Sequence, residues 1–143
     1  MEHKIKDKIL RTVFFGNNPE TMSEVINDSN VLAIFTKDLD EPNIQEIRKI
    51  AKGYNIPVYY PKTNRMEEDK DILKLLNDSR VDLIISSGWH LIMPAEIINI
   101  PKYGTINFHP SFLPSYRGQH VIQWQIINGE REGGLLFISC LKN

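Results

Sequence analysis

The sequence has few of the features that mark secreted, membrane or disulfide-bonded proteins. Its single cysteine, Cys140, excludes an internal disulfide and favours a reducing compartment. No apolar run approaches the ~20 residues that a membrane-spanning helix needs. Residues 1–11 are basic and mixed, without the apolar segment of a signal peptide. A cytoplasmic protein without a membrane partner is therefore expected.

The chain also carries no strong signal for nucleic acid, nucleotide or metal. Its net charge of −1 gives no basic footprint, although this does not exclude an RNA partner. Neither GxGxxG nor a GxxxxGK motif followed by Ser or Thr occurs. Repeats and low-complexity tracts are absent, and no metal is expected. The composition, 41% hydrophobic and 24% charged over 143 residues, suits a single domain spanning residues 1–143.

Short apolar runs alternate along the chain with longer stretches of helical periodicity. The runs are rich in Val, Ile and aromatic residues and predict strands at residues 12–16, 31–36, 57–60, 81–86 and 105–109. Helical spacing predicts helices around residues 44–51, 71–76 and 119–127, with a short helix that has Pro94 at its first position. This alternation predicts an α/β fold with a mostly parallel sheet and helices on both faces. Residues 62–70 are the most polar and are expected to form an exposed connection.

Two predicted strands end in loops that could hold a ligand. Gly16, Asn17, Asn18 and Pro19 follow the first strand, where backbone N–H groups could bind an anion. An ordinary strand-to-helix turn is the favoured interpretation of these four residues.

The second loop follows the fourth strand, and its apolar side chains suit a flat aromatic ligand. A buried loop packed on the core explains it equally well. Its residues are Ser86, Ser87, Gly88, Trp89, His90, Leu91, Ile92 and Met93.

The most informative segment is Asn107-Phe-His109-Pro-Ser-Phe-Leu-Pro-Ser-Tyr-Arg-Gly118. On a strand, Asn107 and His109 share one face, so an amide and an imidazole can converge on one reacting atom. The histidine can move a proton near neutral pH. The asparagine can donate a hydrogen bond to a developing oxyanion. A lone Asn-x-His pair is weak support for a catalytic site, but twelve residues of this composition are stronger.

This segment closely resembles the signature of the 10-formyltetrahydrofolate-dependent formyltransferases. That superfamily includes the glycinamide ribonucleotide, methionyl-tRNA and sugar-nucleotide N-formyltransferases, and the resemblance runs from about residue 11 to about residue 133. It implies a Rossmann-like domain that takes 10-formyltetrahydrofolate as formyl donor. By resemblance, Asn107 would hold the formyl oxygen and His109 would stabilise the tetrahedral intermediate and assist proton transfer. Residues 86–93 would line the pterin pocket.

The resemblance also implies residues that contact the amine substrate. These would be Gly16, Asn17, Asn18, Tyr116, Arg117 and Gly118. The signature does not determine which amine is formylated. The stretch at residues 36–41 is short and acidic, whereas methionyl-tRNA enzymes usually carry a longer basic loop there, and the helix at residues 119–124 looks more like the sugar-nucleotide branch. A nucleotide-linked amino sugar is therefore the preferred acceptor, with methionyl-tRNA and phosphoribosylglycinamide as alternatives, and a homodimer is an open alternative to a monomer.

The end of the chain departs from the family pattern. The family uses an Asp beyond the histidine to orient it, and no Asp follows Asp82 in this sequence. Residues 133–143 do not match the strand and acidic stretch that the resemblance implies there. We interpret this as a truncation by frameshift or premature stop, which leaves the last strand and the catalytic loop incomplete.

Little or no transferase activity is expected from this chain alone, since catalytic units lose most of their rate when one member is removed. A non-catalytic binding remnant, an unrelated Rossmann-type nucleotide-binding protein and an unstable gene product are the rival interpretations.

Overall fold

The computed structural model describes residues 9–62, 65–109 and 136–140, which build a layered α/β fold. The strands form one six-stranded sheet in the order β3-β2-β1-β4-β5-β6. They are β1 (Arg11–Gly16), β2 (Asn30–Phe35), β3 (Val58–Tyr59), β4 (Leu83–Ser87), β5 (Thr105–His109) and β6 (Leu136–Cys140). All neighbours from β3 to β5 pair in parallel, and β6 pairs antiparallel with β5. The predicted α/β class with a mostly parallel sheet is confirmed.

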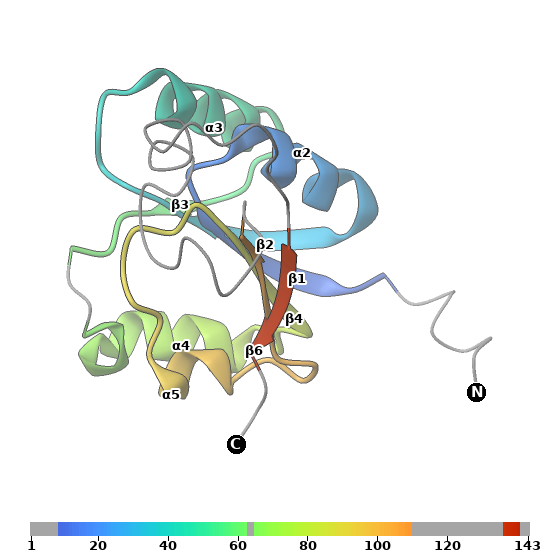
Figure 1. Ribbon diagram of the computed structural model, residues 1–143, viewed down its shortest axis with the longest axis vertical. Coiled ribbons are helices and arrows are strands. Elements are labelled where there is room, and N and C mark those ends of the chain that lie inside the picture. Colours follow the sequence, from blue (N-terminus) through green and yellow to red (C-terminus); the bar gives the residue numbers. More distant parts are fainter. Residues whose placement is uncertain (1–8, 63–64, 110–135, 141–143) are drawn as a thin grey trace, which may run out of the picture.

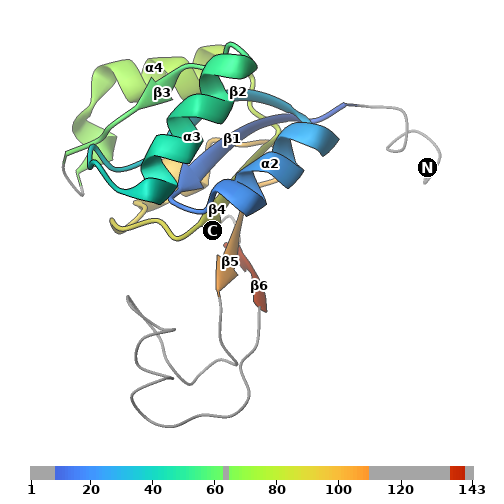
Figure 2. The ribbon, with the colours of Figure 1, turned by 90° about the horizontal axis from the view of Figure 1, so that it is seen from above.

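Helices cover both faces of this sheet (Figures 1 and 2). The helices α2 (Pro19–Asp28) and α3 (Pro42–Gly53) lie on one face. The other face is covered by α4 (Lys70–Asp78), α5 (Ala95–Ile98) and the short 3₁₀ helix η1 (Met66–Glu68). The predicted helix over residues 119–127 lies outside the described residues. The prediction of helices on both faces is confirmed.

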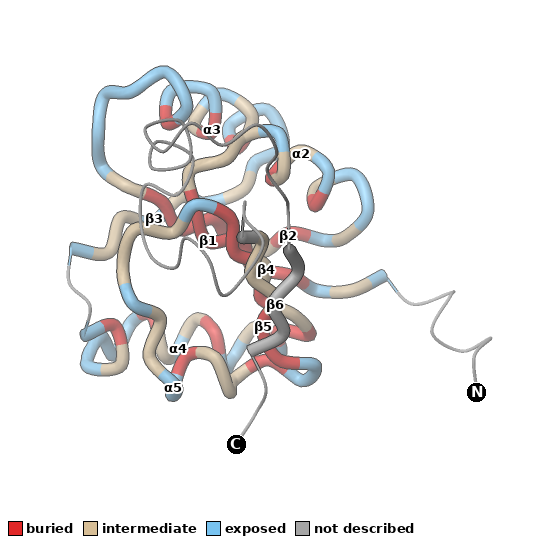
Figure 3. Tube along the Cα trace, viewed as in Figure 1, coloured by how far each residue is buried: buried red, intermediate tan, exposed pale blue. Residues whose placement is uncertain are grey.

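Successive side chains of a strand point to opposite faces of the sheet, so the core is divided into two clusters. On β1, Val13 and Phe15 belong to the cluster under α4 and α5, whereas Phe14 belongs to the cluster under α2 and α3. All three side chains are 1% exposed or less, so β1 is buried on both faces. Figure 3 shows this burial concentrated in the central strands and on the inner sides of the helices. Parallel strands sandwiched between helices have this pattern, and it explains the apolar runs in the sequence.

Two local predictions were wrong in detail. Pro94 precedes α5 as its N-cap rather than occupying the first helical position, because its ψ of 154° is extended. Its carbonyl accepts the first hydrogen bonds of the helix, from the amides of Ile97 and Ile98 at 3.0 and 3.1 Å. The polar stretch at residues 62–70 is not wholly exposed, because Met66 is fully buried in the cluster under α4 and α5. One apolar side chain is thus enough to fold part of this connection onto the core.

Candidate functional site at the carboxyl edge of the sheet

The ends of β1 and β4 meet at the carboxyl edge through a very close backbone approach. The Asn17 amide donates to the Ser87 carbonyl at 3.1 Å. A Cβ atom at Gly16, whose φ is +152°, would lie 1.8 Å from that carbonyl oxygen. A Cβ atom at Gly88, whose φ is +71°, would lie 1.9 Å from Asn17 Oδ1. The two predicted ligand loops are therefore neighbours, and two glycines make their contact possible.

The first of these loops is an ordinary capped helix start. Asn18 Oδ1 accepts hydrogen bonds from the amides of Glu20 and Thr21, each at 3.1 Å, and Pro19 begins α2. Two of the free amides at this helix end are thus satisfied within the chain. This geometry fits the strand-to-helix turn that the sequence favoured. Substrate binding by Gly16, Asn17 and Asn18 stays a prediction.

The second loop, residues 86–93, is partly core and partly surface. Ser86 and Ser87 are buried, while Trp89 and Met93 pack against the cluster under α4 and α5. Ile92, in contrast, is 75% exposed, which is unusual for a large aliphatic side chain. Trp89 Nε1 is buried and has no hydrogen-bond partner among the described residues. The loop therefore holds an exposed apolar side chain, Ile92, and a buried donor without a described partner, Trp89 Nε1.

An aromatic row connects this loop to the neighbouring strands. The Phe15 and Phe35 rings are stacked at 4.4 Å, and the Trp89 ring meets Phe15 edge-on at 5.1 Å. Tyr59 stacks on Phe35 at 5.2 Å, and His90 contacts Trp89 at 4.7 Å. Ring pairs at these spacings are favourable beyond their area burial. The row fixes where Trp89 and His90 lie relative to the ends of β1 and β2.

The backbone places the two predicted catalytic positions beside this loop. Asn107 of β5 lies opposite Ser86 of β4, and His109 ends β5 opposite Leu136 of β6. Thr105 Oγ1 donates to the Ile98 carbonyl of α5 at 3.2 Å, so the Thr105 side chain lies on the α5 face of the sheet. Strand alternation puts the half-buried Asn107 on that same face. The catalytic roles of Asn107 and His109 stay predictions, and Tyr116, Arg117 and Gly118 lie outside the described residues.

Sequence reasoning missed one charged residue of this edge. Burial, and then the charge of Lys37, lower the pKa of His90 from its ordinary value of 6.5. Lys37 follows β2 just as His90 follows β4, so the two side chains share the carboxyl edge. The sequence could have pointed to Lys37, because ligands tend to bind beyond the carboxyl ends of parallel strands, and this rule applies to β2 as well as to β4.

A shallow pocket of about 380 Å³ lies at the opposite, amino-terminal edge of the sheet. It is lined by Arg11, Leu76, Asn77, Arg80, Val81, Asp82, Ile100 and Lys102. Arg11 caps the end of α4 there, donating from Nε and Nη2 to the Ser79 carbonyl at 2.9 and 2.7 Å. The Arg11 amide also donates to Asp82 Oδ2 at 2.9 Å. These contacts give the cation Arg11 a structural role and leave the carboxyl edge as the candidate site.

Comparison with known proteins identifies the family. A family model described as formyl transferase matches residues 15–139 of the chain. The chain belongs to the formyl transferase family. The methionyl-tRNA formyltransferase of Orientia tsutsugamushi is 39% identical over 142 residues, covering 90% of this chain and 44% of that protein. That of Synechococcus elongatus is 31% identical over 139 residues, covering 89% of this chain and 42% of that protein.

Solved structures share the fold of this family member. The phosphoribosylglycinamide formyltransferase from Streptococcus pneumoniae matches with a TM-score of 0.73 at 18% identity, covering 94% of this chain and 76% of that one. A formyltetrahydrofolate deformylase from Pseudomonas syringae matches with a TM-score of 0.68 at 16% identity, covering 94% and 53%. The chain spans less than half the length of the curated relatives it matches. In the described part of the chain, no helix is long and apolar enough to cross a membrane.

Proposed function

We propose that this chain carries the donor and acceptor sites for moving a formyl group from 10-formyltetrahydrofolate to a primary amine. The observation that carries the proposal is the register of β4 and β5, which sets Asn107 opposite Ser86 at the start of the loop over residues 86–93. The proposed oxyanion donor thereby adjoins the loop proposed to hold the pterin. Membership of the formyl transferase family supports the reaction class.

The proposed chemistry balances with the chain's own residues. The amine nitrogen attacks the formyl carbon, and the formyl oxygen gains negative charge in a tetrahedral intermediate. Asn107 donates a hydrogen bond to that oxygen. The bond from the formyl carbon to N10 of the folate then breaks, the new amide loses a proton, and N10 gains one. His109 relays this proton. Holding the amine and the formyl carbon at attack distance supplies much of the rate gain.

A nucleotide-linked amino sugar is the acceptor that we propose. The loop at residues 37–41, between β2 and α3, is short and carries Asp38, Asp40 and Glu41, which would repel an RNA backbone. The curated relatives favour a second candidate, because those of Orientia tsutsugamushi and Synechococcus elongatus are named for methionyl-tRNA. The two acceptors differ in one decisive property: only binding of the RNA should weaken steeply with added salt.

The test measures donor binding first and transfer second. Binding of 5-formyltetrahydrofolate, a stable analogue of the donor, is followed by calorimetry. Transfer from 10-formyltetrahydrofolate is then followed by mass spectrometry with each acceptor in parallel reactions. Asn107→Ala should slow any transfer by roughly 10²–10³-fold, the cost of losing one oxyanion donor. Asn43→Ala, which changes an exposed asparagine of α3, is the matched control. Absence of donor binding contradicts the proposal, and so does measurable transfer whose rate in Asn107→Ala equals that of the control.

A further inference from the structure

The amino-terminal edge of the sheet joins three chain segments around the pocket of about 380 Å³. The Asp82 amide donates to the Arg11 carbonyl at 2.8 Å, which ties the residue before β4 to β1. The Lys102 amide donates to the Val81 carbonyl at 3.1 Å, which ties the turn before β5 to the same place. Arg80 immediately precedes Val81. Backbone hydrogen bonds thus bring cationic residues of three segments, Arg11, Arg80 and Lys102, to the lining of one pocket.

The lining carries more positive than negative charge. Its charged residues are Arg11, Arg80, Lys102 and Asp82, of which only Asp82 is acidic. Arg80 and Lys102 are exposed, and neither forms an ion pair with a carboxylate of the described residues. Lys102 Nζ lies 5.2 Å from the centre of the Tyr103 ring, a contact that leaves its charge unneutralised. The net charge of the lining is therefore positive, which favours an anionic ligand.

The helix end at this pocket would by itself oppose an anion. The pocket adjoins the carboxyl end of α4, where carbonyl groups carry partial negative charge. Arg11 offsets this charge, because its Nε and Nη2 both donate to the Ser79 carbonyl, at 2.9 and 2.7 Å. The structural contacts of Arg11 thus leave the charges of Arg80 and Lys102 to act on a ligand.

Arg80 occupies a backbone position that suits few residues. Its φ of +51° lies in the left-handed region, at the second residue beyond the end of α4. Glycine and asparagine adopt this conformation most readily after a helix, because other side chains crowd the backbone there. The corresponding residue after α3 is Asn55, with a φ of +56°. An arginine at this position after α4 is thus less favourable for stability than an asparagine.

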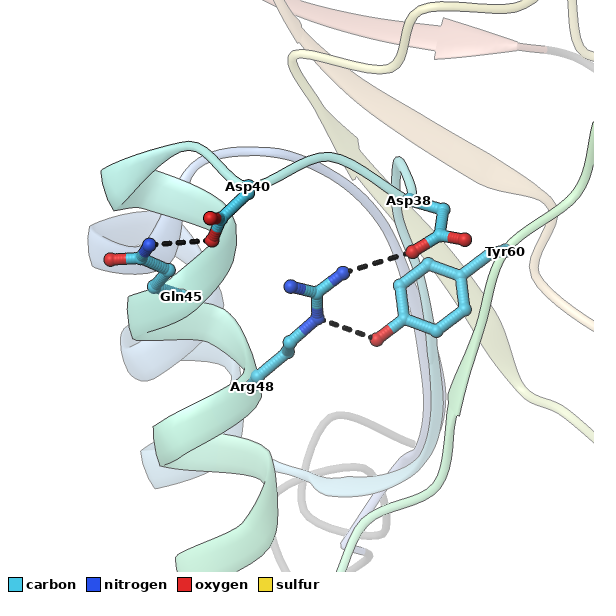
Figure 4. A network of polar contacts seen from close by, with 5 residues as sticks. All are labelled: Asp38, Asp40, Gln45, Arg48 and Tyr60. Atoms are coloured by element: carbon cyan, nitrogen blue, oxygen red, sulfur yellow. Dashed lines mark hydrogen bonds and ion pairs between the residues drawn. The ribbon is translucent and has the colours of Figure 1, made fainter.

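Contacts within the described part of the chain do not account for this arginine. Arg48 shows how the chain holds an arginine for a structural purpose (Figure 4). Its Nη2 pairs with Asp38 Oδ1 at 3.1 Å, and its Nε donates to Tyr60 Oη at 2.9 Å. The Arg80 side chain, in contrast, forms no hydrogen bond or ion pair with any residue that the structure describes. Its position therefore favours a role toward a bound molecule rather than in the fold.

We propose that Arg80 and Lys102 bind the phosphate group of a small organic molecule, at a site separate from that of formyl transfer. The guanidinium and the ammonium both donate charged hydrogen bonds to phosphate oxygens, and such bonds are among the strongest in proteins. Leu76, Val81 and Ile100 also line the pocket and offer an apolar surface to the organic part of the ligand. The volume of about 380 Å³ lies in the range of small-molecule sites. A mononucleotide combines these properties.

The first experiment compares three probes by calorimetry: AMP, adenosine and inorganic phosphate. AMP should bind the wild-type chain, and adenosine, which lacks the phosphate, should bind at least about 10-fold more weakly. Inorganic phosphate distinguishes the two sources of the anion, and it should also bind more weakly than AMP, because it cannot use the apolar surface. Absence of AMP binding, or adenosine binding as tight as that of AMP, overturns the inference. Inorganic phosphate binding as tight as that of AMP overturns the assignment to an organic phosphate.

The second experiment locates the bound phosphate with variants. Lys102→Met and Arg80→Asn should each weaken AMP binding by about 10-fold, the scale of a lost charged hydrogen bond. Lys49→Met removes the same charge from an exposed position of α3 and should leave the affinity unchanged. Unchanged AMP affinity in either pocket variant, or an equal loss in Lys49→Met, overturns the inference.

Thermal unfolding of Arg80→Asn separates binding from stability. Asparagine adopts the left-handed region more readily than arginine, so the unfolding midpoint should stay the same or rise while AMP affinity falls. An arginine with a structural role would give the opposite result for the midpoint. A lower midpoint in Arg80→Asn therefore contradicts the argument that this arginine serves binding rather than the fold.

The outcomes also separate this inference from the proposed function. Saturation with 5-formyltetrahydrofolate should leave the AMP affinity unchanged, because the two proposed sites lie at opposite edges of the sheet. Displacement of AMP by 5-formyltetrahydrofolate overturns the separate site. A wild-type chain that binds AMP but not 5-formyltetrahydrofolate supports this inference and contradicts the proposed function. A chain that binds only 5-formyltetrahydrofolate contradicts this inference alone.

Discussion

At the scale of single residues, the candidate site depends on two glycines that bring two loops together. Gly16 faces the Ser87 carbonyl and Gly88 faces the Asn17 side chain, in both cases at distances that no Cβ atom tolerates. The contact opposite Gly16 is backbone, which cannot rotate away as a flexible side chain can. The sequence predicted a turn at Gly16 from the end of an apolar run. It did not predict that β4 would lie beside β1, where the Ser87 carbonyl makes a side chain at Gly16 impossible.

Gly16→Ala should therefore be severely destabilising. The added methyl group would meet the Ser87 carbonyl oxygen at 1.8 Å on a backbone with φ of +152°, so the junction of β1 and β4 must shift. We expect a loss of about 3 kcal/mol or more in the free energy of unfolding, measured by urea denaturation. Gly53→Ala is the control, because nothing lies within 4 Å of that position. It should be neutral or stabilise by up to about 1 kcal/mol, and equal losses in the two variants would contradict the argument.

His90 should make the stability of the fold depend on pH. Burial first, and Lys37 second, lower its pKa in the folded chain below the ordinary value of 6.5. The unfolded chain then binds a proton more readily than the folded chain does. The stabilisation is complete above pH 6.5 and is lost as the pH falls through the folded-state pKa. Replacing the ring by His90→Gln should flatten the slope of unfolding free energy against pH in that window. A variant with the wild-type slope would show that other groups cause it.

At the scale of elements, periodicity was the most reliable guide. The spacing of Ile44, Ile47 and Ala51 predicted a helix ending near Gly53, and these three residues are the buried ones of α3. The same rule predicted α4, where Ile72 and Leu76 are buried. Boundaries were less certain, because the end of an element depends on its cap. The extended ψ of Pro94, which makes this residue a cap, has no signature in the residue type.

Ile47→Ala tests how far α3 depends on its buried face. The side chain is fully buried in the cluster under α2 and α3, so removing it should leave a cavity. We expect a loss of about 2–5 kcal/mol in the free energy of unfolding. Glu46→Ala, one residue earlier on the exposed face, should change stability by no more than about 0.5 kcal/mol. Thermal and urea unfolding monitored by circular dichroism measure both, and similar values for the pair would contradict the assignment of the buried face.

At the scale of the whole molecule, the sheet has two edges, and formyl transfer is proposed at only one of them. The carboxyl edge brings together the loops after β1, β2 and β4, whereas the pocket at the amino edge adjoins the Arg11 contacts that cap α4. The proposed transferase site lies at the carboxyl edge, away from the pocket lined by Arg80 and Lys102.

Donor binding at the carboxyl edge should stabilise the folded molecule. At a concentration of 5-formyltetrahydrofolate 100 times its dissociation constant, linkage predicts about 2.7 kcal/mol of added stability. Calorimetric or fluorescence melting would record this as a rise in the unfolding midpoint. Lys102→Met, at the amino-edge pocket, should leave the rise unchanged, while Ile92→Ser, which changes the exposed apolar side chain of the loop over residues 86–93, should reduce it. If the donor no longer raises the unfolding midpoint of Lys102→Met but still raises that of Ile92→Ser, the donor binds at the amino-terminal edge and the proposed site is contradicted.

The sequence by itself determined the strands β1 to β5 and the helices α3, α4 and α5 along the chain, the two-sided burial of the strands, and the Asn107 to Gly118 signature of the family. These are local properties, since periodicity and motif spacing need only residues near each other along the chain. Only the tertiary structure decided that Gly16 touches Ser87, that Ser86 lies opposite Asn107 and that the charge of Lys37 lowers the pKa of His90. Each of these depends on which strands are neighbours. That order results from packing the apolar faces of all the elements at once, so no single segment encodes it.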